Sequence, residues 1–344
     1  MEPGALKLKA SILAAVMLAG CEPAYALDVV VQAGTAISNI QLAISATTTA
    51  APPHTITVMP GWYPLFDNTK LTSGVIRSIS GELNGYGSAT DTLCGTNAGG
   101  TTALYVPSAS TIQGIGFTVL RRRFSHSGAK AILFKNCRFT DIGRADDYGG
   151  IGNALGSFIG CEFIRCIGLE VLLDIPLIAN SVFIGCEGFG SYASIVRTDN
   201  NSPYLLESCT FSACKVAGNR PIIDAYGGVT NTTIRNNIVV YTNNAWTGAN
   251  LINAGGNVSN GATFFSAPTG YGTNATISGT DLRLVPGCAA FTAGVFTNAA
   301  RYNSGTNTAY DVRGMNWRVQ TNNASGAYWL SPLDYPQFFG GMIL

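Results

Sequence analysis

The sequence predicts an all-β protein built as a parallel β-helix, also called a β-solenoid, and three observations support this. First, one short phrase recurs six times between residues 114 and 240. Its apolar anchor residues are Phe117, Phe139, Phe163, Phe183, Phe211 and Ile234. Second, successive anchors are separated by 22, 24, 20, 28 and 23 residues, a period typical of solenoids. Third, polar residues alternate with apolar or thiol residues in each phrase, which indicates half-buried strands and not helices.

The repeat unit has the composition of one solenoid coil. It carries glycine and asparagine at its corners and contains no helical run. A coil of this kind buries its inward face only against the coils before and after it. We therefore expect the phenylalanines of successive phrases to stack inside the solenoid.

Six of the nine cysteines follow the same repeat. Cys137, Cys161 and Cys209 each stand two residues before an anchor, and Ser181 takes this position before Phe183. Cys166, Cys186 and Cys214 each stand three residues after an anchor. Stacked side chains in neighbouring coils lie about 4.8 Å apart, whereas a disulfide needs Cβ atoms about 3.5–4.5 Å apart. We expect buried, reduced thiols. A metal or redox site is the alternative, but pairs such as Cys161 and Cys166 are five residues apart and have no histidine nearby, so we predict no metal site.

Composition limits the function classes. Of the 344 residues, 11% are charged and the net charge is +1, which argues against nucleic acid as a partner. The two histidines, His54 and His126, support neither a catalytic triad nor a zinc cluster. Phosphate-binding and dinucleotide-binding motifs are also missing, so we expect no cofactor.

The first 26 residues have the pattern of a secretory signal. Lys7 and Lys9 precede an apolar run, and residues 24–26 form a small-residue cleavage site. Residues 18–21 also match a bacterial lipobox, which makes Cys21 a lipidation candidate. A cleaved signal and a retained anchoring arm both remain open.

Two stretches carry a family resemblance. Residues 58–63, Val-Met-Pro-Gly-Trp-Tyr, resemble the turn that follows the N-terminal cap of many right-handed β-helix proteins. Residues 281–288, and residues 311–318 with 325–329, resemble the closing phrases of bacterial and phage surface β-helix proteins of the pectate-lyase-like and tailspike-like type. The resemblance implies a single-stranded, right-handed parallel β-helix. It does not select a function, because such proteins include secreted surface proteins, carbohydrate-active enzymes and phage tail components. Trp329 departs from the usual acidic residue.

The predicted organisation has four parts. They are a signal-like or anchoring segment at 1–26, an N-terminal cap and first coil at 27–72, the parallel β-helix at 73–265, and a closing region with an apolar tail at 266–344.

Aligning a second strand of each coil predicts one outward column of side chains. Its members are Lys135, Gly156, Asp174, Arg197, Asp224 and Asn253. Asp174 and Asp224 would lie two strands apart, about 9.6 Å, close to the carboxylate separation of inverting glycosidases. The alternative is a structural ladder in which opposite charges relieve repulsion between strands.

We favour the structural interpretation and assign no catalytic residue. An arginine between the two acids should keep both ionised, whereas a general acid needs a raised pKa. If the column were catalytic, Asp174 and Asp224 would be its two acids. Asp146, Asp147 and Asp199 lie in predicted loops and are lesser candidates. As ligand-binding residues we predict Asp174, Arg197, Asp224 and Asn253.

Together these features favour a non-enzymatic component of a virion or surface assembly, such as a phage spike, fibre or decoration protein that contacts a host-surface polysaccharide. We expect other virion or surface proteins as partners and a homo-oligomer, with a trimer as one option. The alternatives are a secreted or lipid-anchored polysaccharide-degrading enzyme and a bacterial adhesin, which would place the chain outside the cell or on the outer membrane.

Overall fold

The structure is a computed structural model, and it describes the solenoid most completely. The described residues are 28–32, 34–36, 38, 42–43, 54–64, 76–80, 92–96, 102–104, 110–119, 124–126, 132–143, 151–152, 156–191, 193–199, 203–226, 231–239, 245–247, 251–259, 302–303, 308–310 and 316–318. The signal-like segment with Cys21, the residues Asp146 and Asp147, the phrases at 281–288 and 325–329 and the apolar tail lie outside these ranges.

Three long parallel sheets form the walls of the solenoid. Sheet A contains β1 (Asp28–Val31), β2 (His54–Val58), β4 (Ile76–Ser80), β7 (Ser110–Gln113), β10 (Ile132–Lys135), β13 (Gly156–Ile159), β17 (Leu177–Ala179), β21 (Tyr204–Glu207), β25 (Thr232–Arg235) and β28 (Ile252–Asn253). Sheet B contains β3 (Gly61–Pro64), β5 (Thr92–Thr96), β8 (Gly116–Val119), β11 (Arg138–Thr140), β14 (Glu162–Ile164), β18 (Val182–Ile184), β22 (Thr210–Ser212), β26 (Ile238–Val239) and β29 (Val258–Ser259). Sheet C contains β6 (Thr102–Leu104), β9 (Phe124–His126), β12 (Ile151–Gly152), β16 (Glu170–Leu173), β20 (Ser194–Thr198), β24 (Ile223–Ala225) and β27 (Trp246–Thr247).

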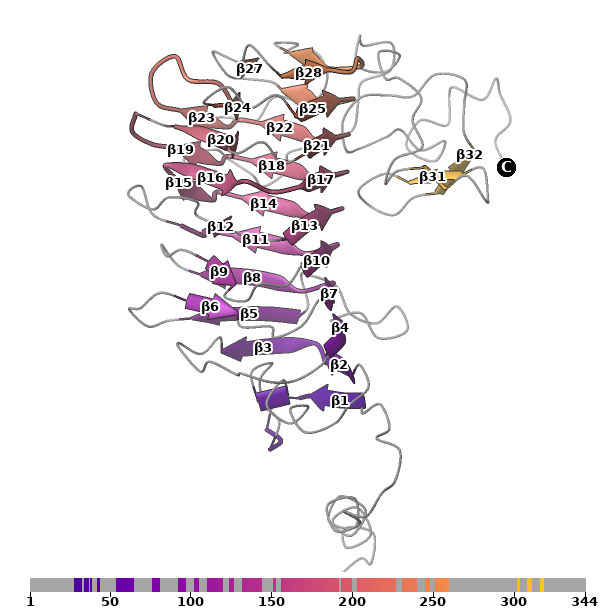
Figure 1. The fold of residues 1–344 in the computed structure, drawn as a ribbon. Helices are drawn as coiled ribbons and strands as arrows, with labels where there is room; N and C mark the ends of the chain where they lie inside the picture. Colours follow the sequence, from indigo (N-terminus) through magenta and orange to yellow (C-terminus); the bar gives the residue numbers. More distant parts are fainter. Residues whose placement is uncertain are drawn as a thin grey trace, which may run out of the picture.

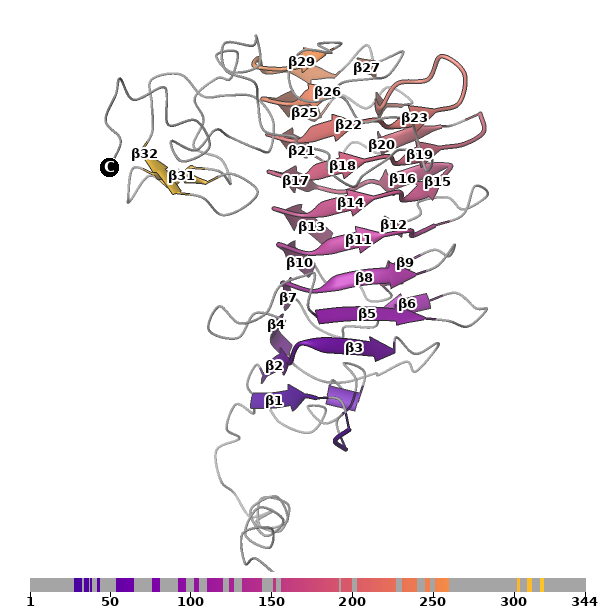
Figure 2. The ribbon, with the colours of Figure 1, turned by 180° about the vertical axis from the view of Figure 1, so that it is seen from behind.

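The coils from β4 to β27 cross sheets A, B and C in turn, and neighbouring coils pair in parallel, as β10–β13, β11–β14 and β16–β20 do. Figure 1 shows the coils stacked along one axis from β1 to β28, and the view from behind in Figure 2 shows the same order. The predicted right-handed parallel β-helix is confirmed, and its hand is the one that parallel crossover connections adopt.

Two small sheets complete the described strands. A short parallel sheet of β15 (Ile167–Gly168), β19 (Glu187–Gly188) and β23 (Lys215–Val216) lies between sheets B and C along the chain. The strands β30 (Tyr302–Asn303), β31 (Thr308–Tyr310) and β32 (Asn316–Arg318) form an antiparallel sheet. Figures 1 and 2 both show β31 and β32 to one side of the solenoid.

The predicted phenylalanine column is confirmed for five of its six members. In sheet B the register aligns Phe117, Phe139, Phe163, Phe183 and Phe211. All five are fully buried, and successive ring centroids lie 5.3, 5.1, 4.5 and 4.4 Å apart. The sixth assignment, Ile234, is wrong: Val239 pairs with Phe211, and Ile234 lies in sheet A beside Leu206. The last phrase, residues 231–239, spans two strands, β25 and β26. The prediction took Ile234, the inward residue of β25, for the inward residue of β26, which is Val239.

The corner between sheets A and B has one backbone conformation in every described coil from β7 onward. One residue per coil has φ between 50° and 67°: Gly114, Asn136, Gly160, Asn180, Ser208, Asn236 and Gly256. Glycine adopts this left-handed conformation without steric cost, and asparagine tolerates it better than most residues. The requirement explains why glycine and asparagine punctuate the repeat.

Every repeat thiol directly follows a left-handed residue: Cys137, Cys161 and Cys209 follow the corners between sheets A and B, and Cys166, Cys186 and Cys214 follow a second corner at the end of sheet B. All six repeat cysteines are unpaired and at most 1% exposed, as predicted. Each Sγ lies 3.4–3.6 Å from a backbone carbonyl oxygen of the preceding coil. Burial raises the pKa of the Cys161 and Cys186 thiols, which keeps them protonated.

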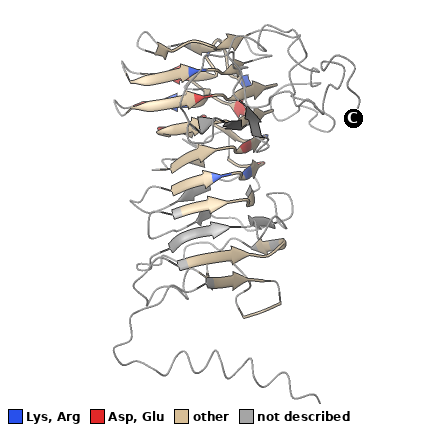
Figure 3. Cartoon of the chain, turned by 90° about the vertical axis from the view of Figure 1, so that its right-hand side faces the viewer, with Lys and Arg blue, Asp and Glu red and all other residues tan. Residues whose placement is uncertain are grey.

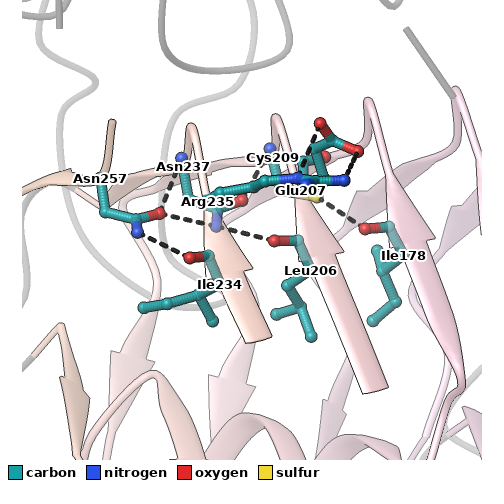
Figure 4. Close-up of polar contacts among 8 residues, drawn as sticks. All are labelled: Ile178, Leu206, Glu207, Cys209, Ile234, Arg235, Asn237 and Asn257. Atoms are coloured by element: carbon teal, nitrogen blue, oxygen red, sulfur yellow. Dashed lines mark hydrogen bonds and ion pairs between the residues drawn. The ribbon is translucent and has the colours of Figure 1, made fainter. Parts of the chain in front are cut away.

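Asparagines take over this position in the last described coils. The Nδ2 atom of Asn237 donates to the carbonyl of Leu206 at 3.1 Å, and that of Asn257 donates to the carbonyl of Ile234 at 3.0 Å (Figure 4). The Oδ1 atom of Asn237 also accepts from the backbone N–H of Cys209 at 2.9 Å. Thiol and amide therefore have the same role: each lies inside the corner and contacts the coil before it.

Candidate functional site

Two of the predicted column residues are neighbours, and one is displaced. Arg197 pairs with Asp224 across β20 and β24. On the other side Arg197 faces Leu173, so the placement of Asp174 in this column is wrong by one residue. Asp174 instead occupies the corner that follows β16, with φ of 54°, and its N–H donates to the carbonyl of Arg197 at 2.9 Å.

The other three predicted column residues lie in a different sheet. Lys135, Gly156 and Asn253 belong to strands of sheet A, whereas Arg197 and Asp224 belong to sheet C. The Oδ1 atom of Asn253 accepts hydrogen bonds from the N–H of Gly255 and from Nδ2 of Asn257, so it ties together the last described corner. The predicted column mixed two sheets because strands of both show the same alternation.

Arg197 is the centre of a buried polar cluster. Its side chain is 5% exposed, and its Nη1 donates to Oε1 of Glu170, itself 1% exposed, at 3.0 Å. Its Nε donates to Oδ1 of Asp199. The guanidinium carbon lies 4.1 Å from the centroid of the Tyr226 ring, within the range of a cation–π contact. A buried charge requires partners of this kind. The sequence did not predict Glu170 and Tyr226 as partners of Arg197, because their places beside it depend on the lengths of the loops between strands.

Asp174 belongs to the same cluster through its hydrogen bonds. Its Oδ1 atom accepts from the backbone N–H of Asp199 at 2.7 Å and from the hydroxyl of Tyr204 at 2.9 Å. Because Asp199 also pairs with Arg197, the network links Asp174 to the arginine through one intermediate residue. The structure thus brings Asp174, Arg197 and Asp224 together, although not in one register.

Asp224 differs from the other acids of the cluster. The residue is 5% exposed, and its Oδ2 atom has no hydrogen-bond partner among the described residues. Burial raises the pKa of this carboxyl group, Arg197 and Arg220 act in the opposite direction, and Asp199 adds to the rise. The expected lowering by Arg197 is thus present, but desolvation outweighs it and the net shift of the Asp224 pKa is upward. Arg197 already pairs with Glu170 and Asp199, and their negative charges offset its attraction for Asp224.

Part of the cluster reaches the surface. Tyr226 is 39% exposed, the Asp199 side chain is 36% exposed, and Asp174 is half-buried. We call these three residues, with Arg197 beneath them, the Tyr226 rim. Figure 3 shows that charged residues of the described strands lie mainly in the middle and upper coils, which include this rim. An aromatic ring beside hydrogen-bond acceptors can hold a polyhydroxylated molecule, because the ring packs on its apolar face and the carboxylates accept from its hydroxyl groups.

Within the described part of the chain, no three histidine, cysteine, aspartate or glutamate side chains are grouped as a metal site requires. The same part of the chain contains no helix that is long and apolar enough to cross a membrane.

Comparison with known proteins gives one structural similarity. The crystal structure of pectate lyase Pel9A matches with a TM-score of 0.32 and 11% sequence identity, over 90% of this chain and 98% of that chain. No protein-family model and no curated protein matches the sequence.

Proposed function

We propose that this protein is a non-enzymatic β-helix component of a virion or cell-surface assembly and that it contacts a host-surface polysaccharide through the Tyr226 rim. A stacked solenoid provides a stiff, elongated support for such a contact. Six reduced thiols support folding in a reducing compartment before release, since cysteines of proteins that fold in oxidising compartments are commonly paired. Under this proposal the chain forms a homo-oligomer, with a trimer as one option, and binds other proteins of the same assembly.

The observation that carries the proposal is an exposed aromatic ring fixed by a buried arginine. Tyr226 stacks on Arg197, and Glu170 and Asp199 hold the guanidinium in place. A ring held in this way loses little conformational freedom when a ligand binds, and such preorganisation increases affinity. The neighbouring carboxylates of Asp174 and Asp199 give the surface its acceptors for sugar hydroxyl groups.

Binding to immobilised polysaccharides tests the proposal. The probes are purified bacterial O-antigens and capsular polysaccharides, and the readout is biolayer interferometry with the full chain. We expect Tyr226→Ala and Asp174→Asn each to weaken binding at least about tenfold, a loss of about 1.4 kcal/mol. Glu162→Gln, on an ion pair of sheet B, is the control and should bind like the wild type. Equal binding by wild type and Tyr226→Ala, or no binding to any probe, would contradict the proposal.

Polysaccharide cleavage is the second candidate, and Asp224 is the observation in its favour. A general acid must hold a proton near neutral pH, and burial shifts the pKa of Asp224 in that direction. Asp199 or Asp174 would then act as the second carboxylate that glycosidases need. Counting reducing ends released from the same polysaccharides separates the two functions. Turnover that disappears in Asp224→Asn while binding persists would place the protein among the enzymes.

A further inference from the structure

The Tyr226 rim presents hydrogen-bond acceptors at its surface while the donors beside them are occupied. The backbone N–H of Asp199 and the hydroxyl of Tyr204 both donate to Oδ1 of Asp174, at 2.7 and 2.9 Å. The Oδ1 atom of Asp199 accepts from Nε of Arg197. Among the described residues, no group donates to Oδ2 of Asp174 or to Oδ2 of Asp199. The rim therefore offers carboxylate oxygens, whereas the neighbouring N–H and O–H groups are already bonded.

The positive charge of the rim is enclosed beneath this surface. The Arg197 side chain is 5% exposed, and its Nη1 and Nε donate to Glu170 and Asp199. Its guanidinium carbon lies 4.1 Å from the centroid of the Tyr226 ring, so the ring lies against the cation. The Asp199 side chain, by contrast, is 36% exposed. A ligand at the rim thus meets a carboxylate before it meets the guanidinium.

The formal charge of the whole cluster is negative. Three acids, Glu170, Asp174 and Asp199, are joined to it by hydrogen bonds or ion pairs. They stand against two arginines, Arg197 and the half-buried Arg220, which acts on Asp224. Asp224 adds a negative charge when ionised and none when protonated, so the sign is the same in both states. The residues that follow Asp199 and Tyr226 in the sequence, 200–203 and 227–230, contain no lysine or arginine.

We propose that the Tyr226 rim selects polysaccharides whose sugars carry hydroxyl groups and no acidic group. The inference rests on the proposed function and names the substrate class of the same site. A sugar hydroxyl can donate to Oδ2 of Asp174 or of Asp199. The apolar face of a sugar ring can pack on the ring of Tyr226, which is 39% exposed.

An acidic group on the sugar would find no suitable partner at this surface. An ionised carboxylate accepts hydrogen bonds and donates none, so it cannot bond to another carboxylate. Like charges also repel it, and two carboxylates about 5 Å away in water lower the affinity about tenfold. To reach Arg197, the acidic group would have to displace Glu170 or Asp199, and breaking a buried ion pair is costly.

Matched polysaccharides that differ only in charge test this selectivity. A neutral polysaccharide that binds the full chain is oxidised at its primary hydroxyl groups to carboxylates, and part of the product is reduced back to the hydroxyl form. In biolayer interferometry at low ionic strength, we expect the oxidised form to bind at least about tenfold more weakly than the original. The re-reduced form should regain the original affinity. High ionic strength should diminish the difference, because salt screens exposed charges.

Charge variants locate the selection at the rim. Asp199→Asn and Asp174→Asn each remove one rim charge, and each should lower the ratio of neutral to oxidised affinity about threefold, half of the tenfold effect on a logarithmic scale. This ratio cancels any general loss of binding by a variant. Glu162→Gln removes an acid from sheet B and should leave the ratio unchanged.

The outcomes separate this inference from the proposed function. Equal or tighter binding of the oxidised form, binding by acidic polysaccharides alone, or an unchanged ratio in both aspartate variants would overturn the selectivity and leave the proposed function standing. Binding to no polysaccharide would contradict the proposed function itself, and the selectivity with it.

Discussion

The lower coils, β10–β14, and the upper coils, β17–β26, share one interior and differ in their exterior. In both, phenylalanines stack inside sheet B, and a left-handed residue begins the corner. Outside, the lower coils carry half-exposed ion pairs such as Arg138–Glu162 and Arg165–Asp141, whereas the upper coils carry buried valine, isoleucine and threonine. The inward residues thus determine the coil, whereas the outward residues differ in chemistry together with their burial.

The two exteriors also differ in their energetics. Half-exposed ion pairs contribute about 0–1 kcal/mol each because water and salt screen them. A fully buried valine or isoleucine side chain contributes about 1.5–3 kcal/mol through the hydrophobic effect. We therefore expect the upper coils to be more sensitive to changes at outward positions. Of the four predictions below, the second tests this difference directly, and the others test the shared interior, the corners and the polar cluster.

The largest effect should come from Phe163→Asp, which disrupts both groups of coils at once. The Phe163 ring stacks on Phe139 of the lower coils at 5.1 Å and on Phe183 of the upper coils at 4.5 Å. An unpaired carboxylate in this column should cost more than about 4 kcal/mol or prevent folding. Urea unfolding followed by circular dichroism measures the loss, and Phe163→Leu is the apolar control. Wild-type stability of the aspartate variant would show that the register of sheet B is wrong.

The second prediction exchanges the outward residues of neighbouring coils. Val182→Glu places a charge at a fully buried outward position of β18 and should lower the free energy of unfolding by about 3 kcal/mol. Glu162→Val removes one half-exposed partner of Arg138 and should change it by less than about 1 kcal/mol. Urea titrations of both variants give the values. Similar losses for the two would mean that the two outward positions do not differ in burial.

The third prediction compares the two kinds of corner residue. Asn237→Ala leaves the Leu206 carbonyl and the Cys209 N–H without their present partner, and should cost about 2 kcal/mol. Cys161→Ala removes a small buried thiol with one weak donor and should cost about 1 kcal/mol. If Cys161→Ala is the more damaging, the thiols contribute more than packing. Thermal unfolding of both variants, at equal protein concentration, decides this.

The interior could be predicted from the sequence because it repeats. Phenylalanine, cysteine and corner residues recur at nearly constant offsets, so one alignment gives the strand of sheet B and the thiol after it. The prediction failed at Ile234, where a phrase contains two strands and the phenylalanine is replaced by Val239. Corner residues with the same conformation also differ in chemistry, as Asn136, Gly160 and Ser208 show, so no single motif marks them.

The candidate site was harder to predict because it lies across connections of variable length. Arg197 and Asp224 were paired correctly, since their strands have similar apolar patterns. Asp174 was displaced by one residue, because β16 ends in a left-handed corner at Asp174 itself. Glu170 contacts Arg197 from β16, the preceding strand of sheet C, and Tyr226 contacts it from just after β24, the following strand. No local spacing in the sequence indicates such contacts.

The last and smallest predicted effect concerns the pH dependence of stability at Asp224. Burial raises the pKa of this carboxyl group in the folded state, so folding favours its protonated form. The stability that the protonated group contributes is fully present below its unfolded pKa of about 4, and it is lost as the pH rises through the raised folded pKa. Asparagine resembles the protonated acid and does not titrate. The stability of Asp224→Asn relative to the wild type should therefore increase as the pH rises from 4 to neutrality. Urea titration at each pH measures the free energies of unfolding of both proteins.

An Asp199→Asn background provides the control for this pH dependence. Removing this like charge, which also pairs with Arg197, lowers the pKa of Asp224 and should narrow the difference in stability. A difference that is constant across this range, or that widens toward acid, would mean that the buried carboxylate is stabilised by a partner outside the cluster.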